Sequence, residues 1–304
     1  MMGNCLTYGQ VHKLSCAAAK QLIEKGLGPN IVVGVCIDEG VYMILVQLAV
    51  LMAGAAFVPV DMNQPRRRIE SMVKISGMQH IIFSSKCSSL EDLQSISMHY
   101  VDDLFSNFSW TSEINSSGKR SALDSESLQD ISCQRMKIPV PSEKSESCEE
   151  VGKTSMKKVC DVNMLKFRDG PEVTNRPDPN TPERSACLSV DTHHLCWIFF
   201  TSGSTGEPKG VRCLHRCAWS YAVNHPFLPH THGEMRVLLA SAATFDPSVG
   251  DAYAVLARGG TLCLWPRCRI VSDLSGCLSE SRATHVTSTP TAWLTVPPPP
   301  ARLP

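Results

Sequence analysis

The fold is decided by residues 31–60, which read IVVGVCIDEGVYMILVQLAVLMAGAAFVPV. Short apolar runs alternate here with a longer apolar segment, a pattern typical of buried strands joined by a buried helix. Strands are predicted over residues 31–37, 57–60 and 80–83, and helices over residues 39–52 and 67–75. Because parallel strands need a crossover that is usually a helix, this βαβαβ pattern predicts an α/β fold with parallel sheets flanked by helices.

A second alternating block begins at Leu195 and ends near Pro290. Its strands are predicted over residues 195–200, 237–242 and 261–265, and its helices over residues 214–223 and 248–257, with a glycine-rich turn after the first strand and a further helix and strand at the end. Between the blocks, serine, lysine and glutamate prevail, and such composition buries too little apolar area to fix a backbone. Residues 98–108 are an exception, because their apolar and aromatic side chains could pack locally.

The chain is therefore expected to divide into four parts. These are a first α/β segment (1–85), a disordered insertion (86–190), a second α/β segment with the glycine-rich turn (191–293), and a proline-rich tail that does not continue the pattern (294–304).

Composition excludes several classes of protein. Twenty-nine basic residues balance twenty-nine acidic ones, so the basic surface that nucleic acids require is not expected. The fourteen cysteines show no paired CxxC spacing, which argues against a zinc site, and no secretory leader is evident, so we expect reduced thiols and a cytoplasmic location. Residues 41–60 are long enough to span a bilayer, but Gln47, Gly54 and Pro59 favour a buried helix and strand, and no membrane partner is expected.

The chemistry is concentrated in residues 201–210, TSGSTGEPKG, directly after an apolar strand. Glycines let a backbone approach an oxyanion closely, while amide and hydroxyl groups donate hydrogen bonds to phosphate oxygens and a lysine adds a compensating charge. A flexible linker is the alternative, but a linker is not expected directly after a buried strand. Neither the Walker spacing nor the dinucleotide G-x-G-x-x-G fingerprint is present at the strand ends.

Three further segments accompany this decapeptide in a fixed order: Leu6-Thr7-Tyr8, residues 51–61 (LMAGAAFVPVD), and residues 245–248 (FDPS). Together they resemble the core motifs of the adenylate-forming (AMP-binding) superfamily. The motifs are most similar to those of nonribosomal peptide synthetase adenylation domains and of amino-acid-activating enzymes like the acyl-CoA synthetases. The resemblance covers roughly residues 6–85 and 190–293.

This resemblance implies an activity and its cofactors. Members join a carboxylate to ATP, release pyrophosphate, and pass the acyl group to a thiol, with Mg²⁺ bridging the phosphate oxygens. The implied partners are ATP, a carboxylic acid, and a phosphopantetheine or CoA acceptor, which a carrier-protein domain could present. The residues expected to bind the phosphates are Thr201, Ser202, Gly203, Ser204, Thr205, Gly206 and Lys209.

The resemblance also implies an amino-acid substrate. In amino-acid-activating members the aspartate of the Phe-Asp-x-Ser motif pairs with the substrate's α-amino group, which assigns that role to Asp246. The alternative role for Asp246 is a helix N-cap. Gly250 falls where many members place a tryptophan that lines the pocket, which implies a roomier or differently shaped pocket.

The chain departs from the family after Trp293. A Tyr-Gly-x-Thr-Glu segment with the magnesium-binding glutamate, a ribose-binding aspartate and a terminal catalytic lysine are all expected there, and none follows. We therefore expect no complete catalytic set and no metal ligand, and an incomplete fragment with weak or no activity. Two alternatives stay open: a fragment of a fatty or aryl acyl-CoA synthetase, and a nucleotide-binding protein without catalysis.

Overall fold

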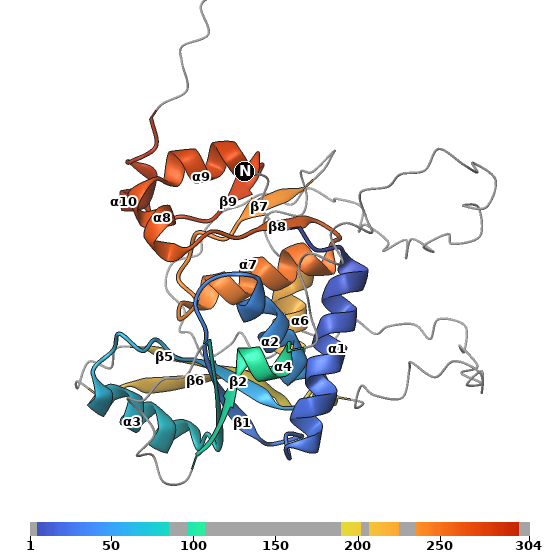
Figure 1. Ribbon diagram of the computed structural model, residues 1–304. Coiled ribbons are helices and arrows are strands. Elements are labelled where there is room, and N and C mark those ends of the chain that lie inside the picture. The colour runs from blue at the N-terminus through green and yellow to red at the C-terminus, as the bar shows by residue number, and fades with distance from the viewer. Residues whose placement is uncertain (1–4, 85–95, 107–189, 202–206, 225–234, 298–304) are drawn as a thin grey trace, which may run out of the picture. The chain divides into compact units, whose positions relative to one another are not determined.

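Six strands form the larger sheet, in the order β4-β3-β1-β2-β5-β6 (Figure 1). They are β1 Val32–Cys36, β2 Ala56–Pro59, β3 His80–Phe83, β4 Ser97–Tyr100, β5 Leu195–Thr201 and β6 Lys209–Leu214. Neighbours from β4 to β5 pair in parallel, whereas β6 runs antiparallel to β5. The computed structural model describes residues 5–84, 96–106, 190–201, 207–224 and 235–297.

Helices connect the first strands as the sequence predicts. The helices of this first part are α1 Tyr8–Glu24, α2 Val41–Met52, α3 Arg66–Ser76 and α4 Val101–Leu104. Helix α1 begins at a capping box in which Thr7 and Gln10 satisfy each other's backbone amides. Helix α3 ends where Gly77 takes a left-handed conformation (φ 66°), which glycine adopts without steric cost. The predicted α/β fold, with mostly parallel strands flanked by helices, is confirmed.

The main core lies where β1, β2 and β5 meet helices α1 and α2. Every residue of β1 and β2 is buried, as expected for parallel strands covered on both faces. Phe57 of β2 is fully buried and pairs in register with Val33 on one side and Trp197 on the other. The ring centroids of Phe57 and Trp197 lie 5.8 Å apart at a tilt of 42°. This aromatic contact stabilises the pairing of β2 with β5, two strands that are far apart in the sequence.

A smaller sheet of three parallel strands, in the order β8-β7-β9, follows in the second part of the chain. Its strands are β7 Arg236–Leu238, β8 Thr261–Cys263 and β9 His285–Val286. The helices of this part are α6 His215–Val223, α7 Asp246–Ala257, α8 Arg267–Ser272, α9 Leu274–Ser281 and α10 Pro290–Trp293. The order of strands and helices agrees with the predicted second α/β block as far as β9, except that β6 is added and that α8 and α9 stand where one helix is predicted.

Direct contacts join the two parts of the chain. The hydroxyl of Tyr8, the first residue of α1, donates a hydrogen bond of 2.7 Å to the carbonyl oxygen of Gly260, just after α7. The ring of Tyr253 on α7 stacks on Trp197 of β5 at 5.7 Å. The tyrosine of the first sequence motif therefore ties the N-terminal helix to the end of α7.

Two parts of the structure differ from the sequence prediction. The sequence prediction does not include strand β6, because residues 209–214 are largely exposed and lack the apolar run expected of a buried strand. The helix predicted from Leu214 therefore follows a strand, and the glycine-rich segment connects two antiparallel strands. Strand β4 and helix α4 lie inside the range 86–190, at the segment expected to pack locally; the rest of that range lies almost wholly outside the described residues.

The described residues all belong to one compact unit. Among the helices that the structure describes, none combines the length and the apolar character needed to cross a bilayer.

Candidate functional site

The ends of the glycine-rich decapeptide are held by a β-hairpin. Thr201 is the last residue of β5 and Lys209 the first of β6, and the two are directly opposite in the antiparallel pairing. The Thr201 hydroxyl donates to the Lys209 carbonyl oxygen at 3.5 Å, and both residues are exposed. The remaining predicted phosphate-binding residues, Ser202, Gly203, Ser204, Thr205 and Gly206, lie outside the described residues.

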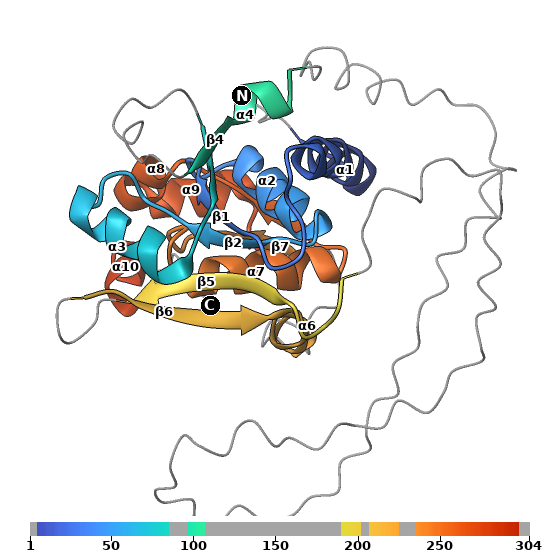
Figure 2. The same ribbon diagram turned by 90° about the horizontal axis from the view of Figure 1, so that it is seen from below.

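A cavity of about 650 Å³ opens beside this hairpin, between β5 and β6 on one side and α6 and α7 on the other. Figure 2 shows α6 next to the paired strands β5 and β6. Aromatic side chains dominate the lining: Trp197, Phe199, Phe200, Tyr221 and Phe245. We call this space the aromatic cavity. Its polar lining includes Thr201, the end of the decapeptide, and Asp246.

The structure thus brings together three of the residues singled out in the sequence. Thr201, Asp246 and Gly250 all line the aromatic cavity, although 49 residues separate Thr201 from Gly250. Parallel strands place their carboxyl ends at one edge of a sheet, and ligands in open α/β sheets bind outside that edge. Thr201 stands at such an end, so a ligand in the cavity lies next to the decapeptide.

Asp246 is the first residue of α7 and is exposed. The N-cap is Phe245, and no side chain caps the helix, so the alternative role of Asp246 as an N-cap is wrong. A carboxylate in the first helical turn interacts favourably with the partial positive charge of the helix N-terminus. The Asp246 carboxylate lies at the rim of the aromatic cavity, where it can pair with an ammonium group.

Gly250 lies one turn further along α7 and is buried against α6. A Cβ atom added there would lie 2.3 Å from Cε1 of Tyr221, which leaves no room for any side chain without displacing the ring. Burial raises the pKa of Tyr221 above its ordinary value, and the charges of Asp251 and Asp246 raise it further. Sequence reasoning missed Tyr221, because its position opposite Gly250 depends on the packing of α6 against α7.

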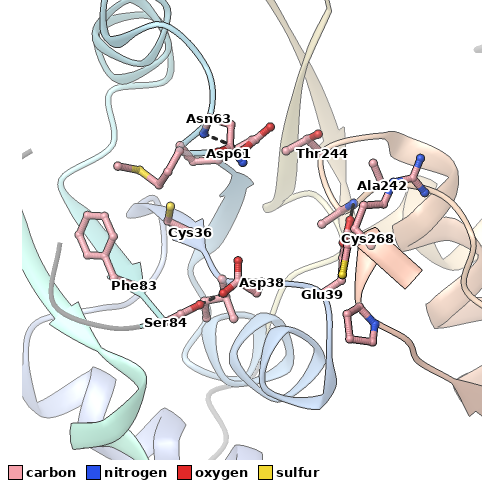
Figure 3. A pocket seen from close by; sticks show the side chains of 16 residues that line it. Cys36, Asp38, Glu39, Asp61, Asn63, Phe83, Ser84, Ala242, Thr244 and Cys268 are labelled. Atoms are coloured by element: carbon pink, nitrogen blue, oxygen red, sulfur yellow. Dashed lines mark hydrogen bonds between the residues drawn. The ribbon is translucent and has the colours of Figure 1, made fainter. Parts of the chain in front are cut away.

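A second cavity, of about 700 Å³, lies at the carboxyl ends of β1, β2 and β3 and reaches α8 (Figure 3). It shares Thr244 with the aromatic cavity. Two of its three acidic side chains accept backbone hydrogen bonds: Glu39 from the amide of Ala243 at 3.1 Å, and Asp61 from that of Asn63 at 2.8 Å. Within the described part of the chain, no group of three or more histidine, cysteine or acidic side chains is arranged to hold a metal ion.

The described ends of the decapeptide carry hydrogen-bond donors that suit a phosphate. Thr201 supplies a hydroxyl and Lys209 an ammonium group at the mouth of the hairpin. These are the groups that donate hydrogen bonds to phosphate oxygens.

Comparison with known proteins identifies the family of the chain. The family model "AMP-binding enzyme" matches residues 2–301, and the chain belongs to that family. The nonribosomal peptide synthetase vlms of Lecanicillium sp is 27% identical over 288 residues, which are 94% of this chain and 2% of that protein. The resemblance to nonribosomal peptide synthetases is confirmed. The chain spans only a small part of the length of such relatives.

Solved structures show the same fold. The o-succinylbenzoate CoA synthetase MenE of Bacillus subtilis, in complex with the acyl-adenylate intermediate OSB-AMP, superposes with a TM-score of 0.64 at 15% identity. The match covers 95% of this chain and 57% of MenE. VinN, in complex with L-aspartate, superposes with a TM-score of 0.62 at 16% identity, over 94% of this chain and 56% of VinN.

Proposed function

We propose that this chain forms the phosphate-binding and acid-binding parts of an enzyme that activates an amino acid as its acyl adenylate, with release of pyrophosphate from ATP. The observation that supports this most directly is that Thr201 and Asp246 line one cavity. A carboxylate and an ATP phosphate must meet for adenylation, and holding two reactants in place supplies much of the rate enhancement.

Each side of the aromatic cavity has a role in this proposal. Lys209 and the hydroxyls of the decapeptide bind the phosphates and stabilise the charge that develops on the leaving pyrophosphate. Asp246 pairs with the α-ammonium group of the amino acid, which orients the carboxylate toward the α-phosphate. The aromatic lining takes the side chain of the amino acid and excludes water from the reacting atoms.

The cofactors and partners follow from the same proposal. Mg²⁺ would neutralise charge on the phosphate oxygens when ATP binds. The thiol acceptor is phosphopantetheine or CoA, and a carrier-protein domain would present the former. Because the chain spans 57% of MenE and 56% of VinN in the two complexes described above, we propose adenylation for a polypeptide that also contains the remaining part, and weak or no adenylation by these 304 residues alone.

The test of the amino-acid assignment is Asp246→Ala. Hydrogen bonds to charged groups contribute about 1.5–3 kcal/mol, so amino-acid binding measured by titration calorimetry should weaken about tenfold or more. Asp102→Ala is the matched control, because Asp102 is also an exposed aspartate in a first helical turn but lines neither cavity. If Asp246→Ala binds amino acids as tightly as the native chain, the assignment fails.

A non-amino carboxylic acid is the second candidate, because most residues that line the cavity are apolar and MenE has the same fold. It predicts binding of an aryl acid that Asp246→Ala leaves unchanged. Amino-acid-dependent exchange of labelled pyrophosphate into ATP, measured on a polypeptide that contains the whole enzyme, would exclude a nucleotide-binding protein without catalysis. Binding of ATP without any exchange would support it.

A further inference from the structure

The packing of α6 against α7 singles out one pair of residues. Gly250 presents no side chain to Tyr221, and the nearest ring atoms would lie 2.3, 2.9 and 3.0 Å from an added Cβ. The backbone of α7 at Gly250 and the Tyr221 ring of α6 are therefore in contact without an intervening side chain. The ring occupies the volume that any residue other than glycine would need at position 250.

The same ring also faces the aromatic cavity. Tyr221 lines the cavity together with Gly250 and Asp246, and it is 49% exposed. The charge of Asp246 contributes to the raised pKa of Tyr221, which places the phenol within electrostatic reach of that carboxylate. Tyr221 thus contacts Gly250 and lines the same cavity as Asp246, the proposed anchor for the α-ammonium group.

We propose that Tyr221 determines the specificity of the aromatic cavity for the side chain of the acid. The inference deepens the proposed function and rests on it. Gly250 alone would leave a deep recess beside α7, and Tyr221 fills it from α6. The cavity therefore favours amino acids with small or medium side chains, and bulky side chains meet the Tyr221 ring.

The packing half of the proposal is tested by a double-mutant cycle on thermal unfolding of the chain. Gly250→Ala should lower the melting temperature, and the double variant with Tyr221→Ala should lose less than the sum of the single changes, by about 2–4 °C or more. Trp219→Ala is the matched control, since Trp219 is an exposed aromatic residue of α6 that does not line the cavity. Its effect should add to that of Gly250→Ala. An additive result with Tyr221→Ala would overturn the proposal.

The specificity half is tested by calorimetric titration with alanine, leucine, phenylalanine and tryptophan. Tyr221→Ala should shift the preference toward the bulkier amino acids by about tenfold or more, the usual scale for a change in fit of an apolar pocket. Tyr221→Phe should keep the native ranking, as should Trp219→Ala. An unchanged ranking in Tyr221→Ala, with binding still dependent on Asp246, would overturn the specificity role alone.

The same titrations separate this failure from failure of the proposed function. If the native chain binds none of the four amino acids, both proposals are overturned. In that case a non-additive double-mutant cycle on the melting temperature would show that Tyr221 contributes to packing only. If amino acids bind but Asp246→Ala has no effect, only the role of Asp246 fails, and the ranking still decides the role of Tyr221.

Discussion

The histidine pair at the edge of the larger sheet makes the stability of the chain sensitive to acid. His80 on β3 and His99 on β4 are stacked, with ring centroids 5.3 Å apart, and Nδ1 of His80 lies 3.0 Å from Nε2 of His99. His99 is only 7% exposed. Burial, the charge of Lys25 and the charge of His80 lower the pKa of His99 to about 4, and Asp103 opposes this shift.

The sign of the effect follows from proton uptake. In the unfolded chain His99 should titrate near its ordinary pKa of about 6.5, so between pH 6.5 and 4 the unfolded state binds more protons than the folded state. The contribution of neutral His99 to the free energy of unfolding is therefore fully present above pH 6.5. It is lost as the pH falls toward 4. A difference of about 2.5 pKa units corresponds to about 3 kcal/mol. Burial also lowers the pKa of His80, which acts in the same direction.

The assay is urea unfolding at pH 7, 6, 5 and 4.5, followed by tryptophan fluorescence. The free energy of unfolding of the native chain should fall from pH 7 to pH 4.5. In His99→Gln this decrease should be smaller, because the contribution of His99 is removed. His12→Gln is the control, because His12 is exposed on α1 and does not belong to the histidine pair of β3 and β4. Parallel curves for the native chain and His99→Gln would refute the reasoning.

Three further predictions concern Phe57 in the core, the hydrogen bond between Tyr8 and Gly260, and Lys209 in the hairpin of β5 and β6. Phe57→Ala should lower the free energy of unfolding by about 3–5 kcal/mol, because Phe57 is fully buried between β1 and β5. Phe57→Leu should lower it clearly less. Equal losses for the two variants in urea unfolding would contradict this. Tyr8→Phe removes the hydrogen bond to Gly260 and should cost about 1 kcal/mol in the same assay; an unchanged midpoint would show that this bond contributes nothing. Lys209→Ala should weaken ATP binding about tenfold in calorimetry, whereas Lys74→Ala, which changes an exposed lysine of α3, should not; equal affinities would argue against a phosphate contact.

The buried strands and helices could be predicted from the sequence because their signals are local. The strands β1, β2 and β3 are short apolar runs, and β1 and β2 are each followed by a helix. Strand β6 has no such signal: Lys209 to Val211 are exposed, and the segment pairs because β5 offers its open edge. The predicted limits of the insertion and the cytoplasmic location stay predictions.

The site was only partly accessible to sequence reasoning. The decapeptide and Asp246 carry recognisable motifs, and the structure adds that Thr201 and Asp246 line one cavity. Tyr221 carries no motif, since its role depends on which face of α6 packs on α7. Residues that act through tertiary contact are found only when the helices are seen together.

The bond between Tyr8 and Gly260 has a consequence for synthesis of the chain, since 252 residues separate its two ends. At roughly 5–20 residues per second, a ribosome needs about 13–50 s to deliver Gly260 after Tyr8 has emerged. For most of that interval, until β5 (Leu195–Thr201) is translated, β2 has no β5 beside it, and an apolar strand with an open edge can pair with other chains. Nascent copies on neighbouring ribosomes are therefore most exposed to aggregation before β5 is translated, and chaperone occupancy should peak in that window.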